Sequence, residues 1–228
     1  MACRRIWGNR DRCVKSTAMN RAAIVFVLAA VLAPAAVAQR ASRPADDWMA
    51  TLEAPERVAS LKIPEVVAAM KLRPGDVVAD LGAGSGLFAV PLATAVGVKG
   101  KVLAVEIDRA FFPHIQRKAK AAGITNVQTI AGEPTDPKLP EAVDVALLHD
   151  VMHHVEDPAA YTKSLAKYLK PTARIVIVDY LMKQGPHRDD PSLQVGKEEA
   201  AKLLASIGFK PLDDVALFPD KYFVIYHR

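Results

Sequence analysis

Short apolar runs alternate with segments of helical spacing along residues 48–228. The apolar runs predict buried strands at 77–81, 102–107, 126–130, 143–148 and 174–178. Apolar residues at helical spacing predict helices over 87–95, 111–119, 159–169 and 198–207. This alternation is typical of a parallel sheet with right-handed crossovers, in which ligands bind at the carboxyl ends of the strands where the strand order reverses.

Both ends of this region carry further elements. Residues 209–216 and 222–226 predict two strands joined by a turn at Pro219–Asp220, a hairpin that closes one edge of the sheet. We therefore expect an α/β fold: a seven-stranded, mostly parallel sheet with an antiparallel C-terminal edge hairpin and helices on both faces. Residues 48–72 predict two short helices, opened by Pro55 and Pro64, near the ligand edge.

The first 38 residues have the pattern of an export signal. An apolar run over 22–33 follows Asn20–Arg21, and Ala36-Val37-Ala38 precedes Gln39 as a signal-peptidase site. We expect translation to begin at Met19, cleavage after Ala38, a linker over 39–47, one domain over 48–228, and a periplasmic or secreted protein. A membrane anchor is the alternative, but the apolar stretch is long enough only if Pro34 is counted within it.

Removing this signal changes the charge and cysteine arguments. Residues 1–38 hold six of the 30 basic residues and one of the 25 acidic ones, so 24 of each sign remain. The basic isoelectric point of the whole chain is therefore no indication of nucleic-acid binding. Both cysteines, Cys3 and Cys13, also lie in the signal, which excludes thiolate metal sites and thiol nucleophiles from the mature chain.

A glycine-rich loop after the first predicted strand offers a nucleotide-sized site. Gly82, Gly84 and Gly86 can take positive φ and let a ligand approach the backbone, while Asp80 would attract a cationic ligand. We expect this loop to open a helix whose free N–H groups point back across it. The dinucleotide fingerprint Gly-x-Gly-x-x-Gly fails by one residue, because Leu87 stands where it needs glycine. An ordinary tight turn is the alternative.

A carboxylate, Glu106, lies near the end of the second predicted strand. Nucleotide-binding folds place a carboxylate at this point, where its two oxygens accept both ribose hydroxyls. The alternative is a solvated charge at a strand end.

These two motifs together resemble a known family. Asp80-Leu81-Gly82-Ala83-Gly84-Ser85-Gly86 resembles motif I of class I S-adenosylmethionine-dependent methyltransferases, and residues 104–108 are similar to their second motif. The resemblance covers about residues 48–228 and implies a Rossmann-like fold with S-adenosyl-L-methionine as cofactor. One departure is Thr172-Ala173, where relatives commonly carry two glycines in a turn remote from the cofactor. The cofactor-binding residues on this basis are Asp80, Gly82, Ala83, Gly84, Ser85, Gly86, Glu106, Ile107, Glu133 and His149.

The fourth predicted strand runs into a histidine-rich string, residues 149–154. His149 and His153 have the spacing of a helical metal pair, but His149 is expected on a strand end and no third ligand is evident, so we predict no metal site. Related enzymes often orient the acceptor directly after this strand. Asp150 is therefore the first catalytic candidate, and His153, which could take a proton near neutral pH, is the second. Alternatively both only brace the turn before Asp157, and we expect His154 to point into the packing beneath the next helix.

The expected reaction is direct displacement of the sulfonium methyl by an unidentified, small-molecule acceptor. Residues 180–196, rich in proline and charge, are expected to cover the acceptor pocket. Two alternatives stay open. One is an exported protein that keeps the fold and binds without turnover. The other is an aminopropyl transferase on the same fold, which ranks last because the sequence shows no acidic cluster for a polyamine.

Overall fold

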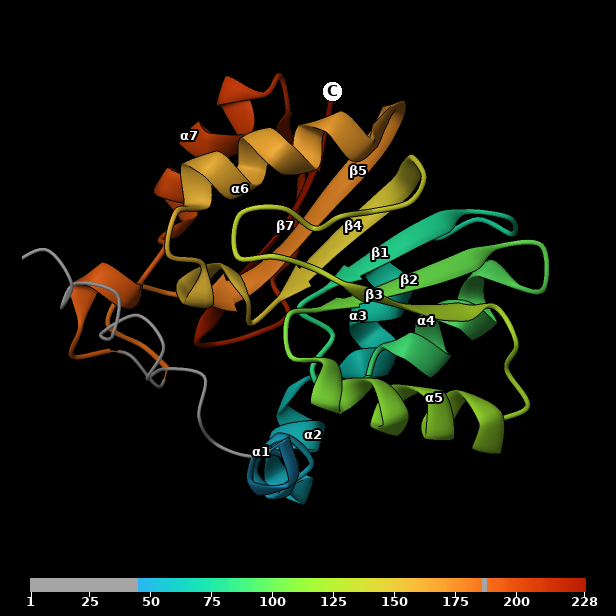
Figure 1. The fold of residues 1–228 in the computed structure, drawn as a ribbon. Helices are drawn as coiled ribbons and strands as arrows, with labels where there is room; N and C mark the ends of the chain where they lie inside the picture. The colour runs from blue at the N-terminus through green and yellow to red at the C-terminus, as the bar shows by residue number, and fades with distance from the viewer. Residues whose placement is uncertain (1–44, 186–187) are drawn as a thin grey trace, which may run out of the picture. The chain divides into compact units, whose positions relative to one another are not determined.

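One seven-stranded sheet forms the centre of the domain, in the order β3-β2-β1-β4-β5-β7-β6 (Figure 1). The computed structural model describes residues 45–185 and 188–228. Every predicted strand is present in this part of the chain. Their bounds are Val77–Leu81 (β1), Lys101–Glu106 (β2), Val127–Ala131 (β3), Val143–His149 (β4), Leu169–Tyr180 (β5), Lys210–Asp214 (β6) and Lys221–His227 (β7).

The strand order reverses beside β1. This strand pairs in parallel with both β2 and β4, so the connections leave it in opposite directions and open a crevice at its carboxyl end. β7 runs antiparallel to both β5 and β6 and closes the other side of the sheet as the edge hairpin. The predicted fold, a mostly parallel Rossmann-like sheet with an antiparallel C-terminal hairpin, is confirmed.

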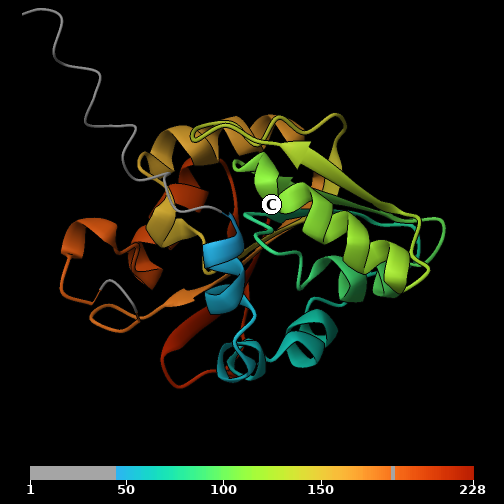
Figure 2. The same ribbon diagram turned by 60° about the horizontal axis from the view of Figure 1, so that its bottom comes forward.

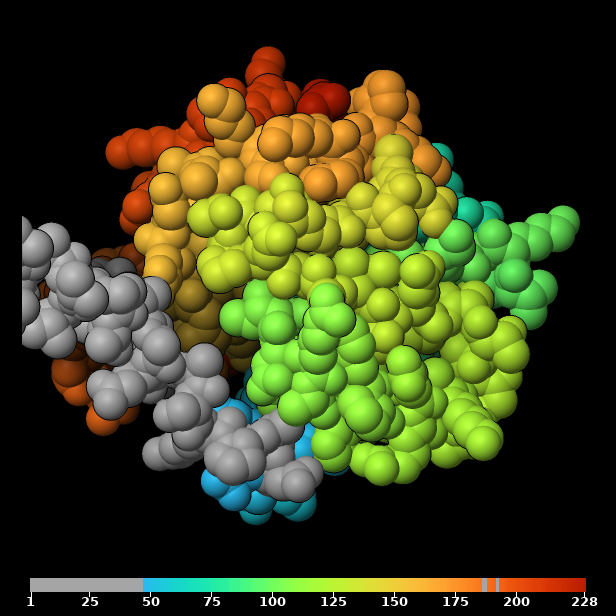
Figure 3. Space-filling view, in the orientation of Figure 1, coloured from blue at the N-terminus to red at the C-terminus, as the bar shows by residue number. Residues whose placement is uncertain are grey.

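Helices cover both faces of the sheet (Figure 1). One layer contains α3 (Ile63–Ala69), α4 (Ala89–Val96) and α5 (Phe112–Ala121), and the other contains α6 (Pro158–Leu165) and α7 (Lys197–Ser206). In the space-filling view the chain between β3 and β4, in yellow-green, lies between α5 and α6 (Figure 3). A large apolar core therefore lies on each face of the sheet.

The central strands read as continuous apolar runs because both of their faces are buried. In β4, Val145 and Leu147 join the core beneath α3 and α4, whereas Ala146 and Leu148 join the core beneath α6 and α7. All four side chains are almost fully buried. Alternation of side chains between the faces of a strand explains this division, and it holds the strand ends at fixed positions.

Three short helices, not two, precede the sheet. They are α1 (Ala45–Leu52), α2 (Pro55–Ser60) and α3, so the last residues of the expected linker are helical. Pro55 and Pro64 lie in the first turns of α2 and α3, as predicted. Figure 2 shows α1 and α2, in blue, between α5 in green and the orange segment after β5.

Several boundaries differ from the sequence-based ones. The helix expected over 159–169 ends at Leu165, because a 3-10 turn over 166–168 leads into β5 at Leu169. β5 is accordingly longer than predicted and includes Thr172-Ala173, although its pairing with β4 changes register between Leu169 and Arg174. The second strand ends at Glu106 rather than 107, and β6 spans 210–214 rather than 209–216.

The predicted export signal and most of the linker lie outside the described residues. Within the described residues, no helix combines the length and apolarity that a membrane crossing requires.

Candidate functional site

The glycine loop lies at the carboxyl end of β1 and has the backbone that the sequence predicts. Gly82, Gly84 and Gly86 have φ of 71°, 51° and 79°. The N–H of Ala83 donates to the carbonyl of Val105 in β2 at 2.9 Å, which fastens the loop between two strand ends. The loop does not open directly into a helix, however. α4 begins only at Ala89, and the N–H of Gly86 is used within the loop, where it donates to Ala83 O.

Close packing requires two of these glycines, whereas a Cβ on the third would make only ordinary van der Waals contacts. A Cβ on Gly82 would lie 2.6 Å from a methyl of Val151, and one on Gly86 would lie 2.8 Å from Ile115. A Cβ on Gly84 would meet only Leu52 of α1, at 3.6 Å, and the backbone O of Gly82 at 4.0 Å. Gly84 is therefore the point at which a ligand can approach the backbone, beneath α1.

Two acidic residues lie beside this loop in different environments. Asp80 is 3% exposed, and its Oδ2 has no hydrogen-bond partner among the described residues. Burial, with a smaller contribution from the charge of Glu106, raises the pKa of Asp80 to about 7. An unpaired carboxylate oxygen at the base of the loop is suited to a positively charged ligand.

Backbone contacts hold the Glu106 carboxylate in one orientation. Its Oε2 accepts from Gly84 N–H at 2.9 Å, and its Oε1 accepts from Ile107 N–H at 2.8 Å and Asp108 N–H at 3.1 Å. Burial raises the pKa of Glu106 above its ordinary value, although these three N–H groups act in the opposite direction. The carboxylate is thus fixed against the glycine loop before any ligand binds.

The remaining expected cofactor contacts divide between the loop and the next two strand ends. Ser85 is buried in the loop, and its carbonyl accepts from Lys118 of α5. Ile107 is 63% exposed beside Gly132, whose N–H donates to Glu106 O. Glu133 lies at the same edge, but its carboxylate forms an ion pair with Lys138 at 3.2 Å.

His149 ends β4 and is buried between two aromatic rings. Its ring centroid lies 4.8 Å from that of Phe88, at the exit of the glycine loop, and 6.1 Å from that of Phe218, before β7. Its Nε2 has no hydrogen-bond partner among the described residues. The structure thus brings His149 beside the expected cofactor loop through Phe88.

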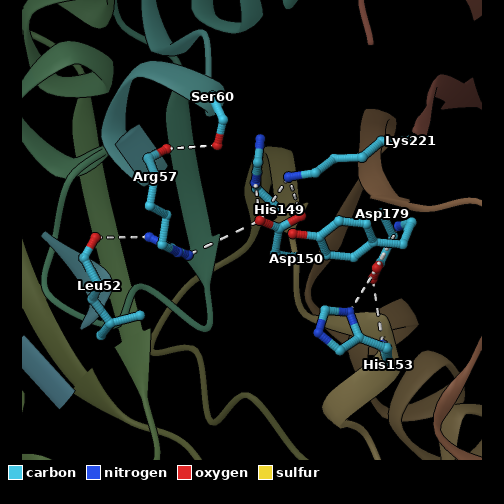
Figure 4. Close-up of polar contacts among 9 residues, drawn as sticks. Leu52, Arg57, Ser60, His149, Asp150, His153, Asp179 and Lys221 are labelled. Carbon is cyan, nitrogen blue, oxygen red and sulfur yellow. Dashed lines mark hydrogen bonds and ion pairs between the residues drawn. The ribbon is translucent and has the colours of Figure 1, made fainter. Parts of the chain in front are cut away.

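Asp150 follows β4 in a left-handed conformation, with φ of 57°, and lies at the centre of a charge cluster (Figure 4). Lys221 Nζ lies 2.7 Å and 2.8 Å from its two oxygens, and Arg57 Nη2 lies 4.0 Å away. Hydrogen bonds and charges from His149 and Lys221 outweigh burial, so the pKa of Asp150 is held far below its ordinary value. Lys221 and Arg57 could not be predicted from the sequence, since no local pattern links β7 or α2 to the end of β4.

His153 faces a different partner, Asp179 of β5 (Figure 4). Its Nδ1 lies 2.6 Å from Asp179 Oδ1, and both side chains are buried. The prediction that His154 packs beneath the next helix is wrong. The 3-10 turn Met152–His154 (η3) turns His153 inward and leaves His154 exposed.

A cleft of about 220 Å³ opens beside His153. The cleft distinguishes the two catalytic candidates, because His153 lines it and Asp150 does not. The segment that was expected to cover an acceptor pocket, 180–196, contributes part of its wall. The lining residues are Met152, His153, Val155, Glu156, Pro158, Pro191, Leu193, Gln194, Val195 and Glu199.

The comparisons identify the class to which this fold and loop belong. Residues 78–172 match the family model described as a methyltransferase domain. The solved structure of an S-adenosylmethionine-dependent methyltransferase from Aquifex aeolicus superposes with a TM-score of 0.70 at 23% identity, over 79% of this chain and 97% of that one. Residues 78–172 therefore form a methyltransferase domain, and the whole domain has the fold of S-adenosylmethionine-dependent methyltransferases, which confirms the resemblance.

Curated relatives match part of this chain and differ from one another in the substrates that their names give. The chain is 31% identical over 147 residues to the ribosomal protein L11 methyltransferase of Thermus thermophilus. This match covers 64% of this chain and 50% of the relative. It is 33% identical over 109 residues to the 2-phytyl-1,4-naphtoquinone methyltransferase of Synechococcus elongatus, covering 47% of each. The chain thus spans about half the length of these relatives.

Proposed function

We propose that this protein binds S-adenosyl-L-methionine at the glycine loop and transfers its methyl group to a small-molecule acceptor. The observation that carries the proposal is the glycine loop at Gly84, where a Cβ would meet nothing closer than 3.6 Å, together with the Glu106 carboxylate that accepts from the Gly84 N–H and the unpaired, buried oxygen of Asp80. These residues fit the cofactor, because its ribose presents a diol and its ammonium and sulfonium groups carry positive charge.

Each of these residues would contact a different part of the cofactor. Glu106 would accept the ribose hydroxyls, and Ile107 with Glu133 would lie toward the base. Asp80, Ala83, Ser85 and His149 would surround the remainder. The cofactor supplies a sulfonium methyl that a lone pair can displace, so the protein's task is alignment and exclusion of water rather than nucleophilic catalysis.

The acceptor side is proposed to lie at the end of β4. His153, held by Asp179, could take a proton from an acceptor, while Asp150 is held by Lys221 and would act through charge or orientation. A small-molecule acceptor is supported by the quinone relative and by the size of the cleft.

Calorimetric titration with S-adenosylmethionine and S-adenosylhomocysteine tests the cofactor assignment. Glu106→Ala should weaken binding by about 1.5–3 kcal/mol, because a charge-assisted contact is lost. Gly84→Val should abolish it, because a branched side chain fills the open side of a residue at positive φ. Parental affinity in the Glu106→Ala variant would show that the ribose assignment is wrong.

A further inference from the structure

The lining of the cleft beside His153 contains both apolar and acidic side chains. Met152, Val155, Leu193 and Val195 line it with apolar surface, and Glu156 and Glu199 supply its carboxylates. No lysine or arginine of the described chain is among the lining residues. A cleft of this composition attracts a cation and repels an anion.

Both carboxylates are available to a ligand. Neither Glu156 nor Glu199 has a hydrogen bond or an ion pair with another described residue, although both lie in the wall of the same cleft. Lys197, two residues before Glu199 on α7, is already paired with Asp214 of β6. The two glutamates come from different elements, the turn before α6 and the first turn of α7, so a ligand between them would contact both sides of the cleft.

The cleft is also connected to the proposed cofactor loop. Val151 packs so closely on Gly82 that a side chain there would collide with it, and η3 follows directly. Met152 and His153 of η3 then form part of the cleft wall. The backbone that forms this wall is therefore fixed to the glycine loop.

We propose that this cleft binds a small organic molecule with an apolar body and a positively charged amino group, and that Glu156 and Glu199 select for that charge. The volume suits a metabolite smaller than a typical drug. The apolar lining residues would contact its body, and the two carboxylates would bind its ammonium group. That this molecule is the methyl acceptor rests on the proposed function, whereas its binding does not.

Two probes with the same aromatic body and opposite charge test the inference on the full chain. Tyramine carries an ammonium group and 4-hydroxyphenylpropionate a carboxylate. Titration calorimetry at low ionic strength should give tighter binding of tyramine. Glu156→Gln combined with Glu199→Gln should weaken tyramine about five- to tenfold, since two exposed ion pairs are lost, and should not weaken the propionate. Circular dichroism of each variant confirms that it is folded.

Glu198→Gln is the matched control, because Glu198 is an exposed neighbour on α7 that does not line the cleft. It should bind tyramine as the parent does. The inference is overturned if the double variant keeps parental affinity for tyramine, if the parent prefers the propionate, or if neither probe binds at millimolar concentration.

Titration of the same preparations with S-adenosylhomocysteine separates this inference from the proposed function. A parent that binds S-adenosylhomocysteine but shows no charge-dependent tyramine binding overturns the cleft assignment alone. A parent that binds tyramine through the two glutamates but does not bind S-adenosylhomocysteine supports the cleft and overturns the cofactor assignment.

Discussion

The carboxyl group of Asp80 is buried, so ionising it costs stability in the folded protein. The pKa of Asp80 is raised to about 7 in the folded protein, against 3.8 ordinarily, because the group is buried near Glu106. The folded state then holds its proton more tightly than the unfolded state. The stability of the fold should therefore fall as pH rises from about 4 to about 7 and stay lower above that.

Asp80→Asn should relieve this cost and raise the melting temperature at pH 8. One pKa unit corresponds to about 1.4 kcal/mol, and 1 kcal/mol to about 2–4 °C for a domain of this size. We expect a gain of several degrees at pH 8 and a smaller one at pH 5, measured by differential scanning fluorimetry. The variant should also bind S-adenosylmethionine more weakly. An equal or lower melting temperature at pH 8 would contradict the argument.

The buried ion pair between Asp150 and Lys221 should contribute to stability. Asp150→Asn leaves the Lys221 ammonium buried without its partner, so we expect a loss of about 3 kcal/mol in the free energy of unfolding. Asp150→Asn with Lys221→Met should recover part of it, because no buried charge is then left unpaired. Chemical denaturation of the two variants and the parent measures both changes.

The same variants decide between the two roles of Asp150. If the residue orients the acceptor, Asp150→Asn should lower turnover about 10²-fold with cofactor affinity nearly unchanged. If it only braces the turn, stability and cofactor affinity should fall together. Parental stability in the Asp150→Asn variant would contradict the role of Asp150 in bracing the turn.

At the scale of elements, the start of α6 follows from two adjacent residues. Asp157 is the N-cap, and its Oδ1 accepts from Ala160 N–H at 2.9 Å, while Pro158 occupies the first helical position. The cap also fixes the end of the segment that carries His153 and Glu156. Local sequence was therefore enough to place this boundary.

Asp157→Ala should lower the free energy of unfolding by about 1 kcal/mol, because an N–H at the helix start loses its acceptor. Asp157→Asn keeps an acceptor oxygen and is the control, with most of the stability retained. Thermal unfolding followed by circular dichroism measures both. A loss of the same size in the asparagine variant would assign the effect to charge instead of capping.

At the scale of the whole molecule, we propose that residues 1–38 direct export and are removed after Ala38. The apolar run and the Ala-Val-Ala site motivate this proposal. Intact-mass measurement on protein recovered from the producing cell should give a chain that begins at Gln39. A chain that retains residues 22–38 would contradict it.

Sequence was sufficient wherever the chemistry is local in the chain. The apolar runs predicted β1 and β4, because burial on both faces favours apolar residues at most positions of a strand. The spacing of the glycines predicted the backbone of the loop, since positive φ is a property of single residues. Family, sheet topology and the edge hairpin followed from these patterns.

Boundaries were less exact where tertiary packing overrides local preference. The helical spacing continues to Leu169, yet that residue pairs with Val143 and belongs to β5. His153 and His154 are identical and adjacent, so sequence could not tell which one is buried. Asp179, on another strand, determines that His153 is the buried one, because its Oδ1 lies 2.6 Å from His153 Nδ1.

The side-chain clusters were decided by tertiary structure alone. Asp150 meets Lys221 because β7 returns beside β5, and no local pattern joins residues so far apart. The sequence shows no acidic cluster, but the turn before α6 and the first turn of α7 bring Glu156 and Glu199 to one cleft. The sequence thus determined the fold and the glycine loop, whose causes are local. The charge of the cleft depends on how distant elements pack, and only the folded chain fixes it.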